Sequence, residues 1–294
     1  MKDQSNEQPE DTSIENKISL PVDEYIEEVP DEKGQKVRHK GVYLLPNLFT
    51  TAALFAGFYS IVSAMYAPVV VAHEGIEVAR DYFIYSAIAI FIAMILDGLD
   101  GRVARLTNTQ SAFGAEYDSL SDMVAFGLAP ALLAFQWSLA EAGKLGWMVA
   151  FIFVACAALR LARFNVQIGS VDKKYFIGLA SPSAAAVVAS SVWAFNKLEI
   201  GGESVVYLMV PLVAAAGALM VSNFKYYSFK TLDIKSRVPF IAILVIVLLF
   251  AIIGTAPAYA LFFIFFGYTI SGPIQFLLHL KKRDKNKSQL DNNL

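Results

Sequence analysis

Four aspartates stand close together in a chain that is otherwise rich in apolar residues. Asp97 and Asp100 are three positions apart, and Asp118 and Asp122 are four positions apart. On a helix, each of these spacings places both side chains on one face. Two antiparallel helices joined by a short turn would bring the pairs together, which carboxylates resist through repulsion and loss of hydration. We therefore expect positive charge between them, although any one of these aspartates taken alone fits a solvated helix end.

The residues around the aspartates indicate which cation would bind. The segment contains no His or Cys, and hard oxygen ligands favour Mg²⁺, Mn²⁺ or Ca²⁺ over zinc. Two divalent ions would balance four carboxylates, and ions about 4 Å apart can clamp the attacking and leaving oxygens of phosphoryl transfer. The pattern thus predicts a diphosphate substrate, which small residues would admit and polar side chains would bind. These residues are Gly98, Gly101 and Gly114, and Arg102, Arg105 and Ser111.

Apolar segments flank the aspartates and make up most of the chain. With 56% hydrophobic and 17% charged residues, the composition is typical of a membrane protein. About eight segments are long enough to cross a hydrocarbon core of about 30 Å, which predicts an all-α, polytopic transmembrane helical bundle. The predicted segments cover residues 46–69, 81–97, 117–139, 145–161, 179–196, 203–222, 238–254 and 257–279.

The two ends of the chain differ from this apolar body. The first thirty or so residues are acidic and poor in aromatic residues, so they bury too little apolar surface to offset the entropy of ordering. We expect a disordered acidic tail over residues 1–41, a transmembrane domain over 42–280 and a basic tail over 281–294. The start also lacks the features of a secretory signal peptide, so we expect no processing.

The distribution of Lys and Arg residues predicts the orientation. With eight helices, and counting from Lys33 onward, nineteen of these residues fall on the side that carries both termini, and three fall on the other side. The excess of positive charge marks the cytoplasmic side. We therefore expect a protein of the inner, cytoplasmic membrane whose termini and aspartates face the cytoplasm.

The aspartates belong to a longer pattern, DxxDGxxAR, eight residues, G, xxxD and xxxD. Eight fixed letters match by chance with a probability on the order of 10⁻¹⁰ per start position. This pattern resembles the signature of the CDP-alcohol phosphotransferases. The resemblance implies a helical membrane enzyme, usually a homodimer, that moves a phosphatidyl or related group from a CDP-linked donor to an alcohol and releases CMP. It is carried by Asp97, Asp100, Gly101, Ala104, Arg105, Gly114, Asp118 and Asp122.

The resemblance also implies roles for individual residues. Asp97, Asp100 and Asp118 would hold one divalent cation, Mg²⁺ or Mn²⁺, and Asp97, Asp118 and Asp122 would hold a second. Asp122 is also the implied proton acceptor. The residues implied to contact the CDP donor are Gly101, Arg105 and Ser111, together with Pro46, Asn47 and Thr50 of the stretch PNLFT.

Further segments point to the acceptor. ALRLARFNV, YFIGLASPSAAA and KSRVPF resemble segments of the membrane-integral phosphatidylserine synthases within this family, so the likeness covers most of residues 42–255. GLASPSAAA departs from the expected form, which has a second proline. The likeness implies CDP-diacylglycerol and L-serine as substrates in phospholipid biosynthesis. Arg160 and Arg163 would then hold the serine carboxylate and Asn165 its other groups; alternatively, the arginines anchor lipid headgroups.

Three other functions remain open at this stage. The same chemistry would serve another acceptor, glycerol 3-phosphate or inositol. A divalent-cation transporter would also use acids in a membrane, but Arg102 and Arg105 would repel cations. A structural scaffold makes no use of the aspartates. Nothing in the sequence suggests a nucleic-acid partner.

Overall fold

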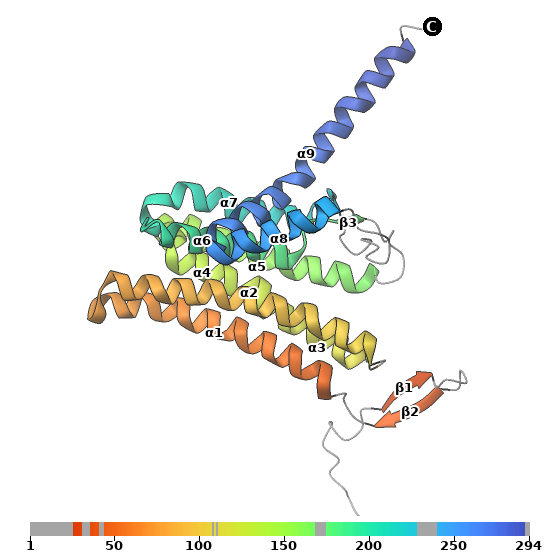
Figure 1. Ribbon diagram of the computed structural model, residues 1–294, viewed down its shortest axis with the longest axis horizontal. Helices are drawn as coiled ribbons and strands as arrows, with labels where there is room; N and C mark the ends of the chain where they lie inside the picture. Colours follow the sequence, from red (N-terminus) through yellow and green to blue (C-terminus); the bar gives the residue numbers. More distant parts are fainter. Residues whose placement is uncertain are drawn as a thin grey trace, which may run out of the picture. The chain divides into compact units, whose positions relative to one another are not determined.

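The computed structural model describes residues 26–30, 36–40, 44–107, 109, 111–167, 175–227 and 240–291. Contacts divide the chain into two units, Met1–Tyr43 and Leu44–Leu294. The second unit is a bundle of long helices (Figure 1). The predicted all-α transmembrane fold is therefore confirmed for this unit.

The first unit contains a hairpin that the sequence did not predict. Strands β1 (Ile26–Pro30) and β2 (Lys36–Lys40) pair antiparallel, with Ile26 opposite Lys40 and Glu28 opposite Arg38. Residues of opposite charge at facing positions favour such pairing. The expected disorder over residues 1–41 stays a prediction, because most of that tail lies outside the described residues.

A helix occupies most of each of the eight predicted apolar segments, and several helices continue beyond the apolar run. Helix α1 (Leu44–Glu74) and helix α2 (Ile76–Leu106) have 31 residues each and lie side by side, joined at Gly75 (Figure 1). Gly75 has a φ of 95°, which favours glycine. Helix α2 extends beyond its predicted end at residue 97, because its remaining turns form a polar surface segment that hydropathy does not detect.

The third predicted segment contains an irregular turn. Helix α3 (Ala112–Asp122) passes into the π-helix η1 (Met123–Leu128) and then into helix α4 (Ala129–Trp137). Gly57 of α1 packs on η1 so closely that an added methyl group would lie 2.8 Å from the Cα atom of Ala125. The π-helix therefore begins directly after Asp122 and is fixed against α1.

Helix α6 (Ser181–Lys197) packs against helices from both halves of the bundle, including α2 and α4, and most of its residues, many with small side chains, are buried. Small residues let neighbouring helices approach closely in a membrane. Strands β3 (Tyr175–Ile177) and β4 (Lys225–Tyr227) form a short antiparallel sheet. The remaining elements are η2 (Leu139–Ala142), α5 (Lys144–Gln167), η3 (Gly202–Val205), α7 (Val206–Val221), α8 (Phe240–Thr255) and α9 (Pro257–Asp291).

Six helical segments of the described chain are long and apolar enough to cross a membrane, which indicates an integral membrane protein. Helices α6 and α8, with 17 and 16 residues, are shorter. Helix α9 continues past its apolar part into the predicted basic tail, as far as Asp291, and extends away from the other helices (Figure 1). The six spans are Leu45–Val71, Ile76–Leu106, Ala112–Trp137, Lys144–Val166, Gly202–Val221 and Pro257–Leu278.

Candidate active site

The aspartates converge where the end of α2 meets the start of α3. Asp97, Asp100 and Asp118 each offer a carboxylate oxygen, and these oxygens all lie within 4.8 Å of one another. Asp122 lies within hydrogen-bonding distance of Asp97, and Asp118 within that distance of Asp100. The two pairs therefore face each other, as the helical spacing predicts.

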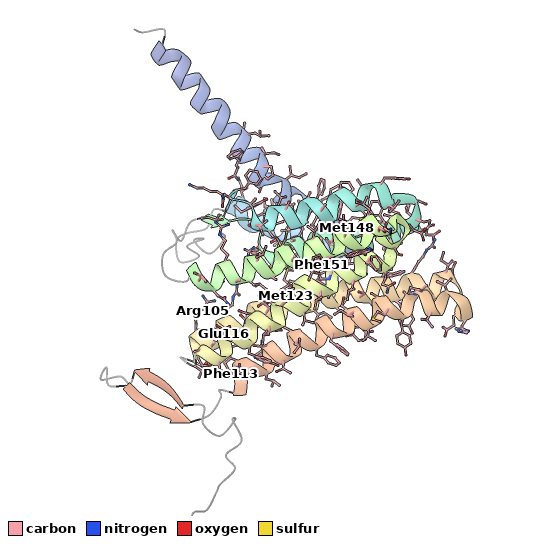
Figure 2. All side chains as sticks on the ribbon, turned by 180° about the vertical axis from the view of Figure 1, so that it is seen from behind. Arg105, Phe113, Glu116, Met123, Met148 and Phe151 are labelled. Carbon is pink, nitrogen blue, oxygen red and sulfur yellow. The ribbon has the colours of Figure 1, made fainter. Side chains whose placement is uncertain are left out.

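Local structure explains why the two helix ends meet. Helix α2 ends at Leu106, and α3 begins after Ser111, whose Oγ accepts a hydrogen bond of 2.9 Å from the Gly114 backbone N–H. This is a standard N-cap, which fixes the first turn of a helix. Figure 2 shows Arg105, Phe113 and Glu116 at the same end of the bundle. The cap thus orients α3 so that Asp118 and Asp122 face α2.

Helix α1 holds this arrangement from one side. The Thr50 hydroxyl donates a 2.8 Å hydrogen bond to Oδ2 of Asp100, and the Ser121 hydroxyl donates one of 3.1 Å to the Thr50 carbonyl. All three residues are buried. Near them, the hydroxyls of Thr51 and Tyr117 lie 2.9 Å apart. The two aspartate-bearing helices are therefore linked through one turn of α1.

The donor set fits divalent cations. Among the described residues, no lysine or arginine forms an ion pair with the four aspartates. Arg160 is near enough to Asp122 for their charges to attract each other. Carboxylates packed this closely repel one another unless a cation or protons lie among them. Oxygen-only ligands from two helices suit Mg²⁺ or Mn²⁺. The residues present can therefore hold the metal that the sequence pattern implies.

The residues predicted to bind the donor lie around the carboxylates. A methyl group added to Gly101 would meet no atom within 4 Å, so its backbone is open to a ligand. The Arg105 Nε–H donates to the Gly101 carbonyl at 2.7 Å, and the Arg105 side chain is exposed. Ser111 acts as the N-cap, yet its hydroxyl hydrogen can still be donated.

The PNLFT stretch opens α1 at the same site. The Pro46 carbonyl lies 3.3 Å from the Thr50 hydroxyl, and the Asn47 carbonyl accepts a 2.7 Å hydrogen bond from the Thr51 hydroxyl. A methyl group added to Gly114 would lie 3.5 Å from Oδ1 of Asn47, so α1 and α3 approach closely. Of these three residues, Thr50 contacts a carboxylate, that of Asp100. Their contact with the nucleotide stays a prediction.

The residues predicted to bind the acceptor do not form one fork in this structure. The Arg160 Nε–H donates to the Leu179 carbonyl, two residues before α6 begins. Arg163 instead donates to the Val221 carbonyl at the end of α7 and to Oδ1 of Asn223, at 3.5 and 2.9 Å. The Nδ2 atom of Asn165 donates to the Ser119 hydroxyl of α3 at 3.0 Å. Serine binding by all three residues stays a prediction.

Two features of the site escaped the sequence analysis. One is the π-helix after Asp122, since its wide turn leaves no mark in the apolar pattern. The other is Tyr268 of α9, which lies within electrostatic range of Arg160. Its neighbour Tyr226 is buried, and burial raises the pKa of Tyr226 to about 12. The neutral Tyr226 hydroxyl donates to the Thr269 carbonyl at 3.0 Å, which ties β4 to α9.

Comparisons with known proteins agree with this geometry. The chain is 38% identical over 250 residues to a CDP-diacylglycerol–serine O-phosphatidyltransferase of Helicobacter pylori, covering 84% of this chain and 98% of that protein. An enzyme with the same name from Methanocaldococcus jannaschii is 37% identical over 188 residues, which cover 64% of this chain and 82% of that enzyme. Residues 43–266 match the family described as CDP-alcohol phosphatidyltransferase. The chain with its cluster of aspartates between α2 and α3 therefore belongs to the CDP-alcohol phosphatidyltransferase family.

Proposed function

We propose that the chain transfers a phosphatidyl group from CDP-diacylglycerol to the hydroxyl of L-serine, giving phosphatidylserine and CMP. The observation that carries the proposal is the group of three carboxylate oxygens within 4.8 Å, with Asp122 beside them, in a member of this family. The relatives named above supply the substrates, because each is named for serine and CDP-diacylglycerol.

The four aspartates would hold two divalent cations, Mg²⁺ or Mn²⁺. Asp97 and Asp118 would contact both ions, Asp100 one and Asp122 the other. When bound, such cations neutralise phosphate oxygens and stabilise the charge that develops during phosphoryl transfer. The open backbone at Gly101 and the donors of Arg105 and Ser111 would bind the diphosphate of the donor lipid.

The reaction forms a bond between the serine hydroxyl oxygen and the phosphorus that carries diacylglycerol. The bond from that phosphorus to the CMP oxygen breaks, and CMP leaves. Because a neutral hydroxyl is a weak nucleophile, its proton must leave, and we assign Asp122 as the acceptor. We assign the serine carboxylate to Arg160, which lies near Asp122, whereas Arg163 and Asn165 position the surrounding helices.

The setting of the site follows from the same features. The excess of Lys and Arg residues on one side supports a cytoplasmic membrane location with both termini and the site in the cytoplasm. A homodimer is proposed from the family resemblance alone.

The purified protein in detergent, with CDP-diacylglycerol and Mn²⁺, tests the function directly. CMP release is measured with serine, glycerol 3-phosphate or inositol as the acceptor, and labelled serine is followed into lipid. We expect rapid release only with serine. CMP release only with glycerol 3-phosphate or inositol would assign that alcohol as the acceptor. Mn²⁺ flux into proteoliposomes without CMP release would indicate a transporter instead.

A further inference from the structure

We propose that Thr50 is a positioning residue that holds Asp100 in its metal-binding orientation. This inference rests on the metal assignment of the proposed function. It also changes the role of Thr50, which the sequence placed among the residues contacting the nucleotide.

The Thr50 hydroxyl donates its hydrogen to Asp100. The hydroxyl lies 2.8 Å from Oδ2 of Asp100 and 3.3 Å from the Pro46 carbonyl, so the shorter contact goes to the carboxylate. A hydroxyl has one hydrogen to donate. That hydrogen is therefore used by Asp100 and is not available to a nucleotide.

The contact between Thr50 and Asp100 is buried. Thr50 is 3% exposed and Asp100 is 5% exposed, so water does not readily replace this contact. Hydrogen bonds to a carboxylate are stronger than those between neutral groups, and a buried acceptor left without its partner carries a large desolvation cost. The hydroxyl thus holds one oxygen of Asp100 while the carboxylate faces Asp97 and Asp118.

The backbone of Thr50 also bonds to α3. Its carbonyl accepts a hydrogen bond from the hydroxyl of Ser121, which precedes Asp122 in α3 and is 2% exposed. The Thr50 turn of α1 is therefore bound to α2 through its side chain and to α3 through its main chain. Residues that bind a metal ligand from behind orient the ligand and raise metal affinity.

The test compares variants that differ in the hydroxyl alone. Thr50→Val keeps the shape and removes the donor, whereas Thr50→Ser keeps the donor. Mn²⁺ binding to the purified protein without substrate is followed by the electron paramagnetic resonance signal of free Mn²⁺. We expect Thr50→Val to weaken Mn²⁺ binding about tenfold to a hundredfold, and Thr50→Ser to recover most of the affinity. Thr50→Ala removes the same donor without adding an apolar methyl beside Asp100, and serves if Thr50→Val does not fold.

A matched control separates positioning from general packing. Ser60 lies on the same helix, and its hydroxyl shares a 2.8 Å hydrogen bond with that of Ser86 on α2. Ser60→Ala thus removes a buried α1–α2 hydrogen bond away from the carboxylates, and its Mn²⁺ affinity should equal that of the wild type. Equal losses in Ser60→Ala and Thr50→Val would overturn the inference.

The activity of Thr50→Val gives a second readout. If Thr50 acts through the metal, raising the Mn²⁺ concentration restores CMP release, and the KM for CDP-diacylglycerol at saturating Mn²⁺ is unchanged. A raised KM for CDP-diacylglycerol that added Mn²⁺ does not correct would instead assign Thr50 to nucleotide binding. Wild-type protein that binds Mn²⁺ but gives no serine-dependent CMP release would refute the proposed function and leave this inference standing. Wild-type Mn²⁺ affinity in both donor-free variants would refute the inference alone.

Discussion

The two sides of the site are built in different ways. On the aspartate side, carboxylates from α2 and α3 face one another, and among the described residues only Asp100 accepts a hydrogen bond from a hydroxyl of another helix. On the arginine side, Arg160 and Arg163 extend from one helix end to the backbone carbonyls of Leu179, just before α6, and Val221, at the end of α7. The aspartate side therefore needs ions to balance its charge, whereas the arginine side also joins α5 to α6 and α7.

The aspartate side is therefore expected to carry the chemistry, whereas the arginine side also supports the fold. Substitutions on the aspartate side should remove function and leave the fold largely intact, because removing a charge from a repelling cluster relieves strain. Substitutions on the arginine side should lower stability as well, because each side chain also satisfies protein acceptors.

The largest effect is expected for Asp97→Asn or Asp118→Asn, since each residue is assigned to both cations. Metal stabilisation of phosphoryl transfer amounts to several kcal/mol, so kcat should fall by at least about a thousandfold. Metal-dependent nucleotide binding, followed by titration calorimetry, should be lost in parallel. Asp81→Asn, an exposed acid near the other end of α2, is the control and should behave like the wild type. Near-normal activity of either site variant at ordinary Mg²⁺ would refute the assignment.

Asp122→Asn should separate donor binding from chemistry. Loss of a general base costs about a hundred- to ten-thousandfold in rate, while Asp97, Asp100 and Asp118 keep one complete set of ligands. We expect CDP-diacylglycerol binding to persist and single-turnover CMP release to be nearly lost. The matched control is Glu116→Gln, an exposed acid on the same helix. If Asp122→Asn released CMP with serine at a rate close to that of the wild type, the proton would go to another group.

The aspartate side was predictable because its geometry is local. Spacings of three and four residues fix a helical face, and the short connection from Leu106 to Ser111 leaves few ways to join the helices. Hydropathy is also a local property of the sequence, so it located the eight apolar segments. It could not locate the polar turns that extend α2, or the π-helix after Asp122, because neither changes the apolar pattern.

The arginine side was not predictable from spacing. Arg160 and Arg163 are three residues apart, as are Asp97 and Asp100, yet the long arginine side chains reach different acceptors. Those acceptors lie just before α6, at the end of α7 and beyond it, and their approach depends on tertiary packing. Tyr268 is placed near Arg160 by the same packing, so no local signal marks it.

Arg160→Ala and Arg163→Ala should give different results, although the two residues are close in sequence. Loss of a charged hydrogen bond to the serine carboxylate costs about 2 to 3 kcal/mol, so Arg160→Ala should raise the serine KM roughly 30- to 160-fold. Its CDP-diacylglycerol KM should stay nearly constant. Arg163→Ala should mainly lower the thermal unfolding temperature, because α5 loses its contacts with Val221 and Asn223. Equal rises in the serine KM would instead support the fork in which both arginines bind the carboxylate.

The smallest effect is expected for Ser60→Ala, which tests whether polar contacts between α1 and α2 matter outside the site. The hydroxyls of Ser60 and Ser86 are fully buried and lie 2.8 Å apart. Hydrogen bonds between membrane helices contribute about 0.6 kcal/mol on average, and the remaining Ser86 hydroxyl can bond to a carbonyl of its own helix. Unfolding in detergent should therefore show a loss of about 0.5 kcal/mol, with kcat unchanged. The double variant Ser60→Ala with Ser86→Ala should be close to neutral, because it leaves no buried hydroxyl without a partner. A large fall in kcat for Ser60→Ala would mean that the whole α1–α2 contact positions Asp100. The special role given to Thr50 would then be wrong, because any hydrogen bond along the helix pair would serve.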